Sequence, residues 1–198
     1  MSDNNTLDYY NQHTADFVNT TQNVDFHEIQ ELFLSFLPAK AKILDFGCGS
    51  GRDTKYFLEN GFKVDAIDGS LELCKLASKF TGIDVKHMYF QDLCEKEKYD
   101  GIWACASILH LNMKDLKDVF LKMITALKFN GVIYTSFKYG NLEGNRNGRY
   151  FTNMDEAKFA DFIDKYDNIT VEELWVTADV RPGRSEEKWL NLILRKKK

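Results

Sequence analysis

The chain has 198 residues, of which 44% are hydrophobic, and this length and composition favour one globular domain with a sizeable core. The formal net charge of −4 argues against a domain that grips nucleic acid over a basic face. The basic end at residues 195–198 is expected to be a solvated terminus.

The four cysteines form no CxxC pair and no Cys/His ligand spacing. We therefore expect no metal site and no disulfide framework, as in a protein of the reducing cytoplasm. The first residues lack the basic and apolar stretches of a signal peptide, and no apolar run approaches the ~20 residues of a membrane helix. The sequence thus predicts a soluble, cytoplasmic protein without a membrane partner.

Strands and helices are expected to alternate along the chain. Apolar spacing and turn residues predict helices at residues 9–36, 71–80, 116–127 and 155–166. A further helix is predicted to end near residue 60. Strands are predicted at residues 42–46, 62–67, 85–90, 99–104, 132–137, 169–177 and 188–194. This order is typical of an α/β domain with a mainly parallel sheet, and the last two strands should form an antiparallel pair. We see one domain over residues 1–198.

A glycine-rich segment between the first strand and the next helix is the strongest local signal. Gly47, Gly49 and Gly51 stand at alternate positions and would let a ligand approach the backbone closely. Asp68 ends the second strand, near the offset at which a carboxylate binds ribose hydroxyls. Taken separately, the glycines could form only a tight turn, and Asp68 could only cap the next helix. Their joint occurrence favours a nucleoside site.

The spacing of the glycines also distinguishes between nucleosides. A dinucleotide site uses G-x-G-x-x-G and receives pyrophosphate at a helix N-terminus, whereas this chain has G-x-G-x-G preceded by Asp45. A carboxylate there would repel pyrophosphate but could take the ammonium group of a methionine moiety, directly or through water.

Residues 43–51 resemble the first motif of class I S-adenosylmethionine-dependent methyltransferases, and Asp68 matches the acidic residue of that family. Residues 91–93, 99–111 and 127–132 resemble its later motifs in order, although Phe129-Asn130 departs from the more frequent Lys-Pro. The resemblance implies a Rossmann-like three-layer α/β sandwich. Its seven-stranded sheet would be mostly parallel, with one antiparallel strand near the C-terminus.

By the same resemblance, S-adenosyl-L-methionine is the cofactor, and residues 1–37 form a helical lid over an α/β core at residues 42–198. The aromatic residues of the lid could equally pack a helix onto the sheet. The implied cofactor-binding residues are Tyr10, Asp45, Gly47, Cys48, Gly49, Ser50, Gly51, Arg52, Asp68, Gly69, Ser70, Gln91, Asp92, Leu93, Ala104, Cys105 and Ala106. The compact form with Arg52 and an early Tyr-Tyr is most similar to small bacterial methyltransferases of the tellurite-resistance type.

Two segments carry arginines where they should overhang the carboxyl edge of the sheet, the edge at which such folds bind ligands. One carries Arg146, Arg149 and Tyr150, and the other carries Arg181 and Arg184. Guanidinium groups clamp carboxylates or phosphates, so these five residues are candidates for binding a small anionic substrate. Alternatively, the arginines pair with nearby acids and fix the loops, the acids being Glu143, Asp155, Asp179, Glu186 and Glu187.

His110 follows the fourth strand and is the candidate catalytic base. It could equally cap the next helix or pack under the lid, and methyl transfer can proceed by alignment alone. The predicted function is methyl transfer to a small molecule, with an anion as one candidate, by a monomer or homodimer. One alternative is a catalytically silent sensor or partner subunit that binds the cofactor. A nicotinamide oxidoreductase is disfavoured by Asp45. A nucleic-acid methyltransferase is disfavoured because the sequence predicts no basic face.

Overall fold

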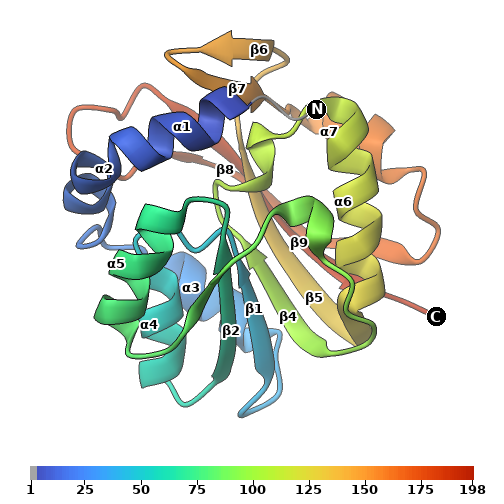
Figure 1. Cartoon of the computed structure of the whole chain (residues 1–198). Helices are drawn as coiled ribbons and strands as arrows, with labels where there is room; N and C mark the ends of the chain where they lie inside the picture. Colours follow the sequence, from blue (N-terminus) through green and yellow to red (C-terminus); the bar gives the residue numbers. More distant parts are fainter. Residues whose placement is uncertain (1–3) are drawn as a thin grey trace.

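A seven-stranded sheet forms the centre of the computed structural model, which describes residues 4–198, in the order β3-β2-β1-β4-β5-β9-β8 (Figure 1). The strands are β1 (Lys42–Phe46), β2 (Lys63–Asp68), β3 (Val85–His87), β4 (Tyr99–Ala104), β5 (Leu127–Lys138), β8 (Ile169–Ala178) and β9 (Lys188–Lys196). Strands β3, β2, β1, β4 and β5 are parallel, and β9 is antiparallel to both β5 and β8. The mostly parallel sheet and the antiparallel C-terminal pair are therefore confirmed.

Helices cover both faces of the sheet and complete three layers (Figure 1). Successive strand residues point to opposite faces, so Ile43 meets the layer of α3 (His27–Ser35), α4 (Arg52–Glu59) and α5 (Leu71–Thr81), with Phe33 and Phe57 in its core. Leu44 meets the layer of α6 (Met113–Ala126) and α7 (Glu156–Ile163). Both faces are buried, as parallel sheets require.

The N-terminal segment is divided differently from the expected single helix. It forms α1 (Asn4–Gln12), α2 (Thr14–Thr21) and α3, with breaks at His13 and at residues 22–26. Only α3 carries the apolar three- and four-residue spacing that packs a helix onto the sheet. Helices α1 and α2 instead cross the end of the sheet near α5 and β7 (Figure 1).

A hairpin after β5 was not predicted as strands. It consists of β6 (Glu143–Arg146) and β7 (Arg149–Thr152), joined by Asn147 and Gly148 with φ of 50° and 76°. Asn-Gly is the preferred pair for such a two-residue turn, so a signal was present in the sequence. Two short 3-10 helices, η1 (Phe90–Asp92) and η2 (Ile108–His110), follow β3 and β4, and η1 explains why β3 ends before Phe90.

Within residues 4–198, no helix is long and apolar enough to cross a membrane. The same part of the chain holds no cluster of three His, Cys, Asp or Glu side chains that could bind a metal. The four cysteines are free thiols.

Candidate functional site

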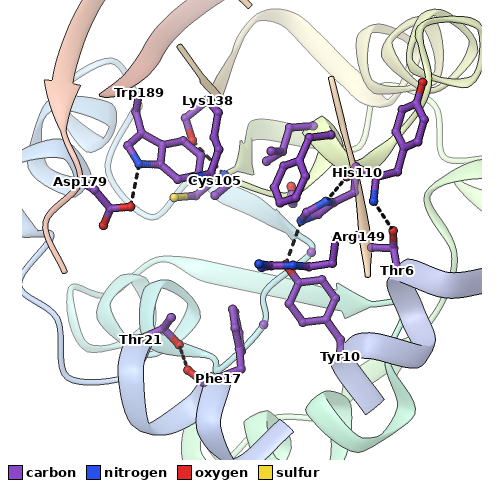
Figure 2. A pocket seen from close by; sticks show the side chains of 18 of the residues that line it. Thr6, Tyr10, Phe17, Thr21, Cys105, His110, Lys138, Arg149, Asp179 and Trp189 are labelled. Atoms are coloured by element: carbon purple, nitrogen blue, oxygen red, sulfur yellow. Dashed lines mark hydrogen bonds between the residues drawn. The ribbon is translucent and has the colours of Figure 1, made fainter. Parts of the chain in front are cut away.

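A cavity of about 740 Å³ lies between the carboxyl ends of the parallel strands, α1, α2 and the β6–β7 hairpin, and Figure 2 shows side chains that line it. Its volume lies in the range of small-molecule sites. One half of its wall comes from the glycine-rich segment, Asp68 and the two N-terminal helices. The other half comes from the ends of β5, β8 and β9 and from the hairpin. We call these the cofactor half and the acceptor half.

Asp68 ties the first two strands together in the cofactor half. Its Oδ2 accepts a hydrogen bond from the amide of Gly49 at 2.9 Å, and its Oδ1 accepts one from the amide of Ser70 at 2.8 Å. The cap of α5 is the hydroxyl of Ser70, which accepts from the amide of Leu73, so Asp68 is not the N-cap. A carboxylate has about four acceptor positions, so Asp68 can still accept a hydrogen bond from a ligand hydroxyl. Burial raises the pKa of Asp68.

Asp45 lies beneath the glycine-rich segment and does not line the cavity. Its Oδ2 accepts a hydrogen bond from the hydroxyl of Thr54 at 2.5 Å, and burial together with Asp53 raises its pKa to about 8. A direct contact with a methionine ammonium group, expected from the sequence, is therefore not available to Asp45. The buried, protonated carboxyl instead joins β1 to α4.

Asp53, unlike Asp45, reaches the cavity wall, and it was not selected from the sequence. It accepts two hydrogen bonds from Arg52, from Nε at 2.7 Å and from Nη2 at 2.9 Å. Gln30 and the indole of Trp103 also donate to it, at 2.6 and 2.8 Å, and hold the carboxylate in place. Asp53 in turn orients the guanidinium of Arg52, which lines the cavity 4.4 Å from the ring of Phe26.

Most of the expected cofactor-binding residues lie on the cavity wall. Those that line it are Tyr10, Gly47, Cys48, Gly49, Ser50, Arg52, Asp68, Gly69, Gln91, Cys105 and Ala106. Those that do not are Asp45, Gly51, Ser70, Asp92, Leu93 and Ala104. Asp92 is exposed and Leu93 is buried in the core, because the 3-10 turn η1 directs only Phe90 and Gln91 toward the cavity.

Side chains of α1 and α2 lie directly against the cofactor half. A Cβ at Gly49 would come within 2.9 Å of the ring of Phe17, and one at Gly69 within 2.8 Å of Leu7. Asn11 accepts a hydrogen bond from the hydroxyl of Ser70 at 2.7 Å. Glycine at these two positions thus allows α1 and α2 to approach the strand ends closely.

His110 lies on the cavity wall, with both ring nitrogens engaged (Figure 2). Its Nε2 is 2.8 Å from the hydroxyl of Tyr10, and its Nδ1 is 2.7 Å from the carbonyl of Tyr150. Burial lowers its pKa to about 4. The histidine therefore stays neutral near pH 7. It packs under α1, which agrees with the alternative that His110 packs under the lid.

All five expected substrate-binding residues line the acceptor half, but their charges are used differently. Arg181 binds Asp179 with both Nε and Nη2, at 2.9 and 2.5 Å. Arg184 binds Glu187 at 2.6 and 2.8 Å. The alternative of loop-fixing ion pairs therefore holds for Arg181 and Arg184.

Arg146 and Arg149, the two arginines of the hairpin, are not paired with an acidic side chain of the described residues. Among the residues that the structure describes, neither Arg146 nor Arg149 forms a salt bridge, and each guanidinium lies 5.2 Å from the ring of Phe151. Arg149 also lies 4.4 Å from the ring of Tyr9 in α1. The uncompensated positive charge of the acceptor half thus lies on the hairpin.

Several acceptor-half residues were not expected from the sequence. Lys138 ends β5 and pairs with Glu187, 5.3 Å from the ring of Trp189, whose indole donates to Asp179 at 3.1 Å. Asn153 follows β7 and is 6% exposed. Their positions depend on the pairing of β5 with β9 and on the hairpin, neither of which was predicted from the sequence.

Comparison with known proteins finds a family that this geometry resembles. Residues 43–131 match the model of the methyltransferase domain, and this segment carries the glycine loop and Asp68. Over this segment the chain is similar to S-adenosylmethionine-dependent methyltransferases.

The chain is 31% identical over 113 residues to YqeM of Bacillus subtilis (strain 168), a protein named as a putative methyltransferase. That match covers 52% of the chain but 46% of the relative, so the chain aligns with about half of that protein's length. An uncharacterized methyltransferase of Staphylococcus carnosus (strain TM300) is 23% identical, over 87% of the chain and 91% of its own length.

Among solved structures, the chain resembles the 1,6-didemethyltoxoflavin-N1-methyltransferase of Burkholderia thailandensis, with a TM-score of 0.79 and 20% identity. The match covers 97% of the chain and 87% of that protein. The N-methyltransferase NodS of Bradyrhizobium japonicum WM9 gives a TM-score of 0.73 at 15% identity, over 95% and 98% of the two chains. Both were solved with S-adenosylhomocysteine, and both share the fold of this chain.

Proposed function

We propose that this chain transfers the methyl group of S-adenosylmethionine to a small anionic acceptor. The observation that carries this proposal is one continuous cavity, which runs from the glycine loop and Asp68 to the arginines of the β6–β7 hairpin. One half has the residues that a nucleoside cofactor needs. The other contains Arg146 and Arg149, which form no salt bridge with the described residues.

The cofactor half fits S-adenosylmethionine on the chain's own residues. Asp68 retains acceptor positions for ribose hydroxyls, and Gly47 and Gly49 have φ of 88° and 55°, which leaves the backbone of the loop uncovered by Cβ atoms. Arg52, fixed by Asp53, can donate to the carboxylate of the methionine moiety. When bound, the cofactor supplies an electrophilic methyl group whose carbon–sulfur bond breaks as the acceptor's nucleophile bonds to the carbon.

The chain's contribution to the reaction is mainly alignment and exclusion of water. Helices α1 and α2 close over the cofactor half through Leu7 and Phe17, and we propose that these two helices act as its lid, while α3, which the expected lid included, packs on the sheet. The neutral His110 holds Tyr10 of this lid. We propose that His110 positions the lid, since its low pKa makes it a weak base.

The relatives support an acceptor that fits beside the cofactor. The Burkholderia thailandensis protein was solved with bound 1,6-didemethyltoxoflavin, its methyl acceptor. A second relative, from Salmonella typhimurium, is named malonyl-[acyl-carrier protein] O-methyltransferase and is 28% identical over 107 residues. The acceptor half of this chain, lined by aromatic and cationic groups, is suited to a small anion.

Calorimetric titration of S-adenosylhomocysteine into the wild type and Asp68→Ala tests the proposal first. We expect saturable binding by the wild type and a loss of at least about tenfold in affinity in the variant. Asp84→Ala, a change on the surface before β3, is the matched control and should bind as the wild type does. Absence of heat and of a thermal shift with the wild type would overturn the proposal.

A further inference from the structure

Strand β7 presents three side chains of different chemistry to the acceptor half. Arg149, Phe151 and Asn153 are two residues apart, and alternate residues of an extended strand point to the same side. The extended pairing continues past β7, since the amide of Asn153 donates to the carbonyl of Leu142 at 2.8 Å. A cation, an aromatic ring and an amide therefore follow one another along one wall, over about 13 Å between the outer Cα atoms.

The two polar ends of this row each have an unused hydrogen-bonding atom. The Oδ1 of Asn153 is buried and accepts no hydrogen bond from the described residues, and the Nε of Arg149 is buried and donates none. Asn153 is 6% exposed, so its carbonyl oxygen is shielded from bulk solvent and has no partner among the described residues. Buried polar atoms are nearly always paired, which makes these two atoms candidates for ligand contacts.

The middle of the row is an aromatic ring. Phe151 stands between Arg149 and Asn153 in the row, and the indole of Trp189 also lines the cavity. Lys138 lies 5.9 Å from the ring of Phe151 and 5.3 Å from that of Trp189, and it pairs with Glu187, which also binds Arg184. A flat apolar body suits such aromatic faces.

We infer that the acceptor is an elongated, flat molecule with an anionic group at one end and an N–H or O–H donor at the other. The anion binds the guanidinium of Arg149, the body packs on Phe151, and the donor binds the Oδ1 of Asn153. This inference rests on the proposed function and adds the arrangement of groups that the site selects. Arg149 and Asn153 are then the specificity-determining residues.

The test uses three probes that differ by one group each, namely 4-hydroxycinnamate, cinnamate and methyl 4-hydroxycinnamate. Cinnamate lacks the donor, and the ester lacks the anion. Their dissociation constants are measured by calorimetry on the full chain saturated with S-adenosylhomocysteine. We expect 4-hydroxycinnamate to bind about tenfold or more tightly than the ester and about threefold or more tightly than cinnamate, since bonds to charged groups are the stronger ones.

Variants connect each group of the probe to its residue. Asn153→Leu should bind 4-hydroxycinnamate and cinnamate equally, and Arg149→Gln should bind 4-hydroxycinnamate and its ester equally. Asn153→Ser serves if the leucine variant does not fold. Arg195→Gln, whose side chain pairs with Glu172 outside the cavity, should keep the wild-type preferences.

The outcomes separate this inference from the proposed function. If S-adenosylhomocysteine binds but no probe does, or if the three probes bind equally, the inference is wrong and the proposed function stands. The inference is also wrong if the variants keep the wild-type preferences. If S-adenosylhomocysteine itself does not bind, the proposed function fails, and the calorimetric baseline shows this before any probe is added.

Discussion

The hydroxyl of Tyr10 lies 2.8 Å from Nε2 of His110 and joins α1 to the turn that follows β4. The other nitrogen, Nδ1, faces the carbonyl of Tyr150, which can only accept, so Nδ1 carries the proton. Nε2 is then the acceptor, and Tyr10 donates to it. One histidine thus connects the lid, the sheet and the hairpin.

Tyr10→Phe should loosen the lid. The change removes the donor to His110 and should lower the free energy of unfolding by about 1 kcal/mol. Amide hydrogen exchange should become faster in residues 4–21 in particular. Tyr166→Phe, which loses a bond to the carbonyl of Lys117 far from the lid, should leave exchange in residues 4–21 unchanged. Equal exchange in Tyr10→Phe and the wild type would contradict the role of this contact.

His110 should make stability depend on pH. Burial lowers its pKa to about 4, below the value of about 6.5 in the unfolded chain. The unfolded state therefore binds the proton first, so the stabilisation is complete above pH 6.5 and is lost as the pH falls toward 4. His110→Gln lacks this titration. Between pH 7 and 4.5, urea unfolding should show the wild type losing about 2 kcal/mol more stability than the variant. Parallel curves would refute this.

Asp45 should have the opposite pH dependence. Its pKa in the folded protein is raised to about 8, so the folded state holds a proton that the unfolded state has released. Stability from this carboxyl is complete below about pH 4 and is lost as the pH rises through 8. Asp45→Asn, which is always neutral, should gain stability relative to the wild type between pH 6 and 9 in denaturant titrations. Thr54→Val, which loses the hydrogen bond but titrates nothing, should keep the wild-type slope.

Gly49→Ala should weaken cofactor binding through crowding. The new Cβ would lie 2.9 Å from the ring of Phe17 and would push the lid away from the loop. We expect at least about a tenfold loss of affinity for S-adenosylhomocysteine by calorimetry. Gly61→Ala is a matched control, because Gly61 also has a positive φ, of 81°, but has nothing within 4 Å of its added Cβ. If both variants bind alike, the close approach of Phe17 is irrelevant to binding.

Arg181→Ala should act mainly on stability. Its guanidinium pairs with Asp179, whose side chain is 2% exposed and whose pKa is lowered to about 2, with Arg181 among its hydrogen-bond donors. Removing Arg181 leaves that carboxylate short of donors and should cost about 1–3 kcal/mol of unfolding free energy at pH 7. Because the Asp179 pKa is depressed, this stabilisation is lost as the pH falls toward 2. An unchanged thermal midpoint at pH 7 would show that the pair contributes nothing.

The sequence by itself determined the sheet, the glycine loop and Asp68, because these depend on short-range patterns. Strand and helix periodicity, the alternate glycines and the offset to Asp68 are each readable within about 25 residues. The same is true of the antiparallel last pair. The hairpin was not predicted, but its Asn147-Gly148 turn is also a local sequence signal.

Only the tertiary structure decided which charges remain available and which residue holds the lid. Arg181 and Arg149 look equivalent in the sequence, yet the fold pairs one with Asp179 and places the other beside Tyr9 without an acid among the described residues. Tyr10 and His110 are 100 residues apart in the chain. Such contacts depend on how elements that are distant in the chain pack together. Packing of this kind, unlike strand or helix periodicity, produces no repeating sequence pattern from which it can be predicted.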